Sequence, residues 1–216
     1  LRANATAILS ECIVKNSTGV RGGAIYSTGG NLTVKEACFF ENNTASASGG
    51  AILAASTSTI EIANSTFVGN RATDMGGSIV ANMTANAETT AKIIDCTFRE
   101  NKVSEGETLN GQGGAIASTV DAVDRCVIEN CIFEQNAAKQ GGAIGFSSGG
   151  KGTVNGGTYT GNKAVDETQG NDMAVLGTGK KVKLSGVIKA EVYHKIVDEG
   201  YGGNRLANWL NERGVK

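Results

Sequence analysis

A two-part sequence motif recurs along this chain of 216 residues. An aromatic or aliphatic residue is followed three places later by Asn, and a box of the type Gly-Gly-Ala-Ile comes a few residues after that. The pairs are Ile13/Asn16, Phe40/Asn43, Phe67/Asn70, Phe98/Asn101, Phe133/Asn136 and, without a box after it, Tyr159/Asn162. The boxes begin at Gly22, Gly49, Gly76, Gly113 and Gly141, so they recur every 27, 27, 37 and 28 residues (22 to 49, 49 to 76, 76 to 113, 113 to 141). A repeat of this length is typical of a solenoid.

The contents of one period indicate which kind of solenoid this is. Short runs such as Leu32–Val34 and Ile60–Ile62 alternate apolar and polar residues, as strands do, and no period contains a convincing amphipathic helix. Three strands per period follow: the box, the alternating run and the aromatic segment. The sequence therefore predicts an all-β fold, a parallel β-helix of about six to seven coils, right-handed because parallel crossovers prefer that hand.

Each repeated position then has a structural role. We expect the repeat aromatics to form one internal column and the box isoleucines another, at the strand spacing of ~4.8 Å. Asn suits a tight corner, because it tolerates the left-handed region, and stacked Asn side chains can bond along the column. The paired glycines permit a bend or close packing at a cramped corner.

These motifs resemble the polymorphic outer membrane protein repeat, which carries Gly-Gly-Ala-Ile and Phe-x-x-Asn signatures. The resemblance covers roughly Ile8 to Val175, with Ser78 in place of Ala, Ile13 and Tyr159 in place of Phe. It implies a β-helix from a secreted or surface-displayed bacterial protein, often an adhesin. We therefore expect an extracellular or cell-surface location.

Charge and hydropathy restrict the partners. The net charge is −1 with both signs dispersed, which disfavours a nucleic-acid partner, since that would need a basic face. No apolar run approaches the ~20 residues that span a bilayer, so the sequence does not predict a membrane-spanning segment. The chain does not begin with Met, and we expect it to be a segment of a longer or processed protein.

The cysteines do not have the spacing of a zinc site, and the sequence predicts neither a metal site nor a cofactor. They are Cys12, Cys38, Cys96, Cys126 and Cys131. Cys38, Cys96 and Cys131 each precede the repeat aromatic by two residues and should point inward with it, whereas Cys12 is one place out of that frame. We expect a column of buried free thiols. A Cys96–Cys131 disulfide between neighbouring coils is the alternative, within tight geometric limits.

One period is stretched by two insertions, Ala81–Thr90 and Glu105–Gln112. Insertions in solenoids map to loops that often lie on the binding face. Tolerated surface drift is an equally good interpretation, because long loops cost little extra entropy.

After Val175 the pattern changes, and we divide the chain into a β-helix over residues 1–188 and a capping segment over 189–216. A helix over Asn204–Glu212 would place Leu206, Trp209 and Leu210 on one face. The favoured role is a cap over the open end of the core, and the alternative is a helix that docks a partner.

Many β-helices are polysaccharide lyases or glycoside hydrolases, and a hydrolase needs two carboxylates across a sugar groove. The candidates are Asp95, Glu100, Asp121, Asp124 and Asp172. Asp121 and Asp124, with Arg125 beside them, form a weak catalytic alternative. None of these carboxylates recurs as a column, and the single histidine, His194, lies in the C-terminal segment. The sequence therefore favours a non-catalytic, adhesin-like module that binds a host or matrix protein or a glycan, over a carbohydrate-active enzyme.

Overall fold

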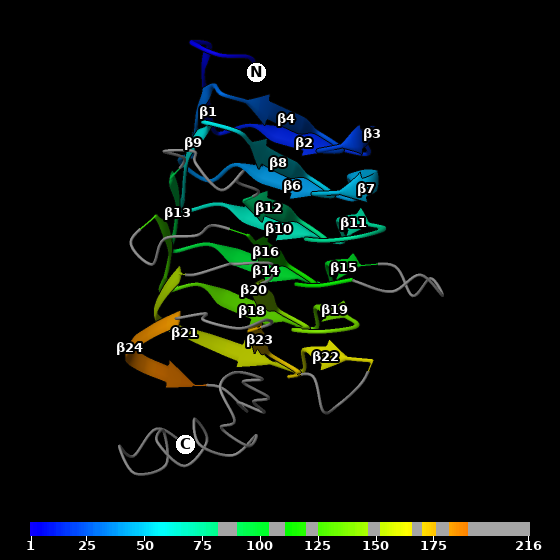
Figure 1. Cartoon of the computed structure of the whole chain (residues 1–216), viewed down its shortest axis with the longest axis vertical. Helices are drawn as coiled ribbons and strands as arrows, with labels where there is room; N and C mark the ends of the chain where they lie inside the picture. The colour runs from blue at the N-terminus through cyan, green and yellow to red at the C-terminus, as the bar shows by residue number, and fades with distance from the viewer. Residues whose placement is uncertain are drawn as a thin grey trace.

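The computed structural model describes residues 1–81, 90–103, 111–119, 125–146, 152–165, 170–175 and 182–189. These residues form a parallel β-solenoid of about five turns, which runs from the N-terminal coil at the top of Figure 1 to the later coils below it. The all-β, parallel solenoid is thus confirmed, and the described residues contain no helix. The right-handed winding and the count of six to seven coils stay predictions. The helix over Asn204–Glu212 lies outside the described residues, as does all but the first residue of the segment 189–216.

Each coil contributes four strands in a fixed order. The first ladder contains the alternating runs: β1 (Thr6–Ser10), β5 (Asn31–Lys35), β9 (Thr59–Ala63), β13 (Thr90–Ile94), β17 (Cys126–Glu129) and the start of β21 (Gly152–Thr160). The second contains the aromatic segments: β2 (Ile13–Lys15), β6 (Phe39–Glu41), β10 (Thr66–Val68), β14 (Thr97–Arg99), β18 (Ile132–Glu134) and the end of β21. Because β21 belongs to both ladders, they join into one sheet, and β24 (Val182–Lys189), which pairs with β21, makes it 12-stranded.

Two six-stranded sheets complete the coil. The third ladder contains β3 (Thr18–Arg21), β7 (Thr44–Ser48), β11 (Arg71–Ala72), β15 (Lys102–Val103), β19 (Ala137–Ala138) and β22 (Lys163–Ala164). The fourth contains the boxes: β4 (Ile25–Thr28), β8 (Ile52–Ala55), β12 (Ile79–Ala81), β16 (Ile116–Ser118), β20 (Ile144–Phe146) and β23 (Met173–Val175). The prediction of three strands per period was therefore one short, because the third-ladder strands are mostly too short to show a period in the sequence.

The two predicted core columns are confirmed. Neighbouring rings in the aromatic column lie 4.8 to 5.1 Å apart, centroid to centroid, and are nearly parallel; the column contains Phe40, Phe67, Phe98, Phe133 and Tyr159. The box isoleucines pair in register with one another, and those from Ile52 to Ile144 are fully buried. Burial of these two columns supplies the main apolar stabilisation of the solenoid.

The first repeat is shifted by one residue from the predicted frame. Val14, not Ile13, pairs with Phe40, and Ile13 is 70% exposed. Correspondingly, Ser17 stands in place of the ladder Asn, and its N–H donates to the side-chain oxygen of Asn43. The prediction that Ile13 and Asn16 are the repeat pair was wrong, because two overlapping frames fit the sequence there.

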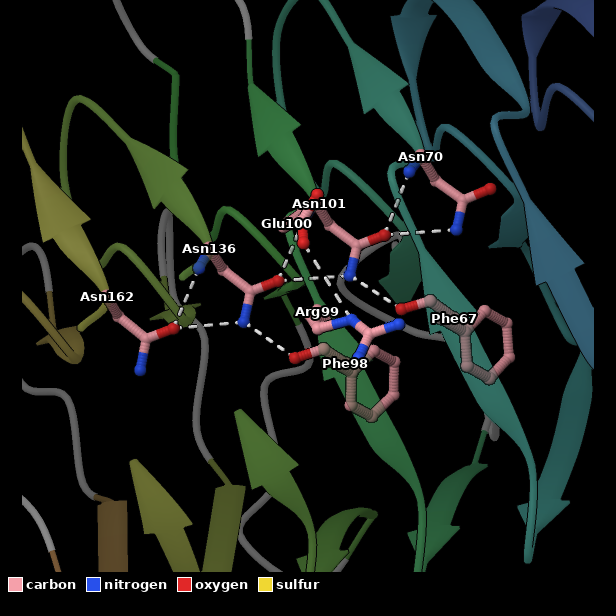
Figure 2. A network of polar contacts seen from close by, with 8 residues as sticks. All are labelled: Phe67, Asn70, Phe98, Arg99, Glu100, Asn101, Asn136 and Asn162. Atoms are coloured by element: carbon pink, nitrogen blue, oxygen red, sulfur yellow. Dashed lines mark hydrogen bonds and ion pairs between the residues drawn. The ribbon is translucent and has the colours of Figure 1, made fainter. Parts of the chain in front are cut away.

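The repeat Asn side chains form a continuous internal ladder (Figure 2). The Oδ1 of Asn101 accepts hydrogen bonds of 3.0 Å from both the backbone N–H and the Nδ2 of Asn70. The Nδ2 of Asn101 donates to Asn136 on the next coil and to the carbonyl of Phe67. The left-handed conformation belongs instead to the residue before each ladder Asn, for example Asn42 (φ 52°) and Glu100 (φ 56°).

The two box glycines have different roles. Gly76 has φ of 58°, a conformation that favours glycine. A Cβ on Gly77 would collide with the Gly114 carbonyl oxygen and would lie 2.6 Å from the Lys102 backbone nitrogen. The first glycine therefore permits the bend and the second permits close packing of adjacent coils, so both predicted roles apply.

Phe98→Ala should lower the free energy of unfolding by roughly 3–5 kcal/mol, because the rings above and below cannot move into the gap. Denaturant unfolding measures the change. The matched control is Arg99→Ala on the exposed side of the same strand, which should change stability by no more than about 0.5 kcal/mol. Equal effects of the two substitutions would contradict the burial of Phe98.

Candidate functional site

The strongest predicted catalytic pair cannot be placed. Asp121 and Asp124 lie outside the described residues, so the catalytic role proposed for them stays a prediction. Arg125 is half-buried just before β17, and its carbonyl oxygen accepts a hydrogen bond of 2.7 Å from the Ala91 N–H. This backbone hydrogen bond links β13 to the residue before β17, that is, two adjacent coils.

Asp95 and Glu100 lie at two different corners of one coil. Asp95 follows β13 with φ of 50°, at the turn between the first and second ladders. Glu100 follows β14 at the next turn, and its carboxylate lies 3.8 Å from Nε of Arg99 (Figure 2). Both residues are exposed and adopt the left-handed backbone conformation. The sharp turn at each corner explains that conformation.

Asp172 is buried and ends the Asn ladder rather than facing a substrate groove. Its side chain is 4% exposed, and its Oδ1 accepts a hydrogen bond of 2.9 Å from Nδ2 of Asn162. Every ladder amide points its NH₂ group toward the next coil, so the donor end of the ladder meets this carboxylate. Such a charge-assisted bond is stronger than a neutral one. A structural role for Asp172 therefore replaces the predicted catalytic one.

The buried thiol column is present, and it is longer than expected. Cys12 pairs with Cys38, because Ile13 pairs with Phe39; the prediction that Cys12 is out of frame was therefore wrong. The column continues through Ser65 to Cys96 and Cys131. All five cysteines are free, so the Cys96–Cys131 disulfide is absent here. The neighbouring Cys96 thiol and burial raise the pKa of Cys131.

The insertion loops are only partly visible. Residues 82–89 and 105–110 lie outside the described residues, so their role in binding stays a prediction. Gln112 is buried and belongs to the solenoid, not to a surface loop. It bridges Met75 and Gln140 in a short parallel ladder before the boxes, and its Nε2 lies 3.2 Å from Oε1 of Gln140.

A hollow of about 310 Å³ lies beside the fourth ladder, at its N-terminal end. Tyr26 and Leu53, neighbours in register on β4 and β8, line one side. Leu53 is buried in a small apolar cluster with Val80 and Ala117 on the outer side of this ladder. Polar residues and two alanines line the rest, and the full lining is Arg21, Tyr26, Ala47, Ser48, Leu53, Ala55, Ser56 and Asp74.

The hollow combines the chemical groups of a small binding site. The Tyr26 side chain presents a flat apolar face and a hydroxyl, and Tyr26 is 37% exposed. Arg21 and Asp74 are exposed and carry opposite charges. Convergence of a few polar groups around an apolar surface is typical of a ligand site. The hollow can hold a small ligand group that has one apolar face and forms hydrogen bonds at its edge.

Sequence reasoning missed Arg21, Tyr26 and Asp74, although one signal was present. In the other four complete repeats the residue after the box is Leu53, Val80, Ala117 or Gly145, and only the first box is followed by an aromatic residue. Arg21 and Asp74 had no such signal, because neither residue type recurs at the same position before the other boxes.

The comparisons with known proteins identify one repeat. Residues 37–55 match the family model of the Chlamydia polymorphic membrane protein repeat. The chain carries a polymorphic membrane protein repeat. The match spans β6, β7 and β8, that is, an aromatic segment, a ladder Asn and a box, which are the elements that recur through the solenoid. No curated protein and no solved structure matches the chain.

Two kinds of site are absent from the described residues. They contain no helix that is both long and apolar enough to cross a membrane. They also contain no group of three or more His, Cys, Asp or Glu side chains arranged to hold a metal ion.

Alkylation of the native protein at pH 8 should modify Cys12 first and Cys126 last. Cys12 is partly exposed, whereas burial raises the pKa of the Cys126 thiol to about 11 from 9.0, so the reactive thiolate is scarce at that position. Peptide mass spectrometry measures the order, and denatured protein is the control in which the difference should vanish. Equal native labelling of all five thiols would contradict the buried column.

Proposed function

We propose that this chain is a non-catalytic binding module displayed at a bacterial surface, similar to an adhesin. The polymorphic membrane protein repeat supports this assignment. The chemistry of the fold supports it as well, since the repeated aromatic, Asn and Ile residues are all committed to the interior columns. Ligand contacts then belong to the outward side chains, which vary from coil to coil.

The hollow at Tyr26 is the observation that carries this proposal. It places an aromatic face, two opposite charges and hydroxyl groups on a surface that rigid strands hold in place. Strands position side chains more precisely than loops do. A pyranose ring of a glycan or a side chain of a matrix protein fits this chemistry, because each offers an apolar face with polar groups around it.

An enzyme is less well supported by the described residues. Glu100 is ion-paired, Asp172 is buried, and Asp95 lies at a different corner. A polysaccharide lyase or hydrolase on this chain would have to depend on Asp121 and Asp124. Reducing-sugar release that is lost on Asp121→Asn or Asp124→Asn would establish that alternative and refute the non-catalytic one.

Tyr26→Ala should weaken binding at least about fivefold to whichever probe the native chain binds in a screen of immobilised glycans and matrix proteins, since stacking contributes ~1 kcal/mol or more. Titration of the selected probe against each variant measures the change. Tyr26→Phe keeps the ring and should retain most of the affinity.

The matched control is Phe39→Ala, which removes a half-buried outward ring on β6, away from the hollow. It should leave binding unchanged. The account would be refuted if Phe39→Ala and Tyr26→Ala lowered the affinity equally, or if the native chain bound no probe of either class.

A further inference from the structure

Basic side chains occupy the outer surface of the third ladder on four consecutive coils. Arg71 opens β11, Lys102 opens β15, Lys139 follows β19 and Lys163 opens β22. We call these four residues the basic strip. The strand residues that follow, such as Ala72 and Val103, are buried, so the alternate side chains face outward. These strands are stacked along one side of the solenoid in Figure 1.

The register makes this strip exceptional among the charged pairs of the surface. Three pairs of charged residues opposed on adjacent strands have opposite signs: Lys15 with Glu41, Glu61 with Lys92, and Arg99 with Glu134. Arg71 and Lys102 are also directly opposed, but they carry the same sign. Like charges in this position destabilise a sheet. The three strand pairs named above avoid such a cost, so folding alone does not explain this pair.

The strip also lacks a counter-charge within the described part of the chain. The ion pairs found there join Lys35 to Glu36 and Arg99 to Glu100, and neither involves the strip. The strands β11, β15, β19 and β22 contain no acidic residue. The cations are therefore available to an external anion.

We propose that the basic strip binds a linear polyanionic polysaccharide, carboxylated or sulfated, that lies along the solenoid axis. Adjacent coils are ~4.8 Å apart, so the four coils span roughly 14 Å along the axis. Arg71, Lys102 and Lys163 share one register position; Ala137 stands at that position on β19, and Lys139 lies two residues further along the chain. A polymer with regularly repeated anions can contact several of them at once. Contacts that are individually weak at an exposed surface then add up to useful affinity.

The geometry favours a polysaccharide over a nucleic acid. Single-stranded nucleic acids bind to basic grooves that also provide aromatic side chains for base stacking. The described strands of the third ladder contain no aromatic residue. The strip thus provides charge without a stacking platform, which suits a polymer recognised through its anionic groups.

The strip is on a different ladder from the Tyr26 side of the hollow, and the two proposals can fail separately. Heparin is the sulfated probe, dextran the neutral one, and a single-stranded DNA of matched charge the nucleic-acid one. We expect the full chain to bind heparin, not dextran, and to bind DNA more weakly. The logarithm of the heparin affinity should fall linearly with the logarithm of the salt concentration, as counterion release requires.

The variant Arg71→Gln/Lys102→Gln/Lys139→Gln/Lys163→Gln should bind heparin at least about tenfold more weakly and with a shallower salt slope. The control Lys15→Gln/Lys35→Gln/Lys92→Gln/Lys183→Gln removes as many exposed cations from other faces and should bind almost as the native chain does. Circular dichroism confirms that each variant is folded, and Lys102→Glu alone provides a second variant with the same expected direction.

Three results would overturn the proposal. The native chain could fail to distinguish heparin from dextran, the two quadruple variants could weaken heparin binding equally, or DNA could bind as tightly as heparin. The first result would mean that the chain does not recognise a polyanionic polysaccharide. The second would mean that binding depends on net charge and not on the strip. The third would mean that the strip is a nucleic-acid site. Tyr26→Ala should leave heparin binding intact, whatever its effect at the hollow.

Discussion

The Asn ladder is the interaction on which the rest of the solenoid depends. Each ladder amide is fully buried from Asn43 to Asn136. From Asn70 to Asn136, each amide oxygen accepts from the backbone N–H and the Nδ2 of the preceding ladder Asn, and each Nδ2 donates to a carbonyl of the preceding coil. Buried polar groups without partners are costly, so one coil can stack on the next only in the register that completes these bonds. That register also places ring on ring and isoleucine on isoleucine. Specificity of the stack therefore comes from the polar column, and most of its stabilisation comes from the apolar ones.

An interior of this kind separates structure from function. The inward positions are bound to repeat, because each must match the coil above and below it, whereas the outward positions are free to vary. The two proposed binding surfaces, the hollow at Tyr26 and the basic strip, are accordingly formed by residues that do not recur in the repeat. Tyr26 departs from the small or aliphatic residues after the other boxes, and Arg71 beside Lys102 departs from the opposite-sign pairing of other faces. Such local departures are where function is expected in a sequence that is otherwise consistent with its fold.

The same separation explains what the sequence could predict. The aromatic column, the isoleucine column and the parallel stacking follow from residues such as Phe67 and Ile79, which recur in one frame. The first repeat was misplaced because Ile13 and Val14 both fit, and the pairing of Val14 with Phe40 and the hydrogen bond from Ser17 to Asn43 decide between them. Asp172 was counted among the candidate catalytic carboxylates, because nothing in the sequence marks it as the last partner of the ladder. The hollow requires strand register across three coils, which no local pattern encodes.

The free energy of unfolding of Asn101→Ala, measured in denaturant, tests the central role of the ladder most directly. The substitution removes the acceptor of the Asn70 backbone N–H and the side-chain donor to the Phe67 carbonyl. It also removes one of the two hydrogen bonds at the Nδ2 of Asn70 and one of the two at the Oδ1 of Asn136. We predict a loss of roughly 3 kcal/mol or more, since each orphaned buried group costs ~1–3 kcal/mol. The adjacent exposed control, Lys102→Ala, should change stability by about 0.5 kcal/mol or less. A loss at Asn101 no larger than that of the control would contradict the account.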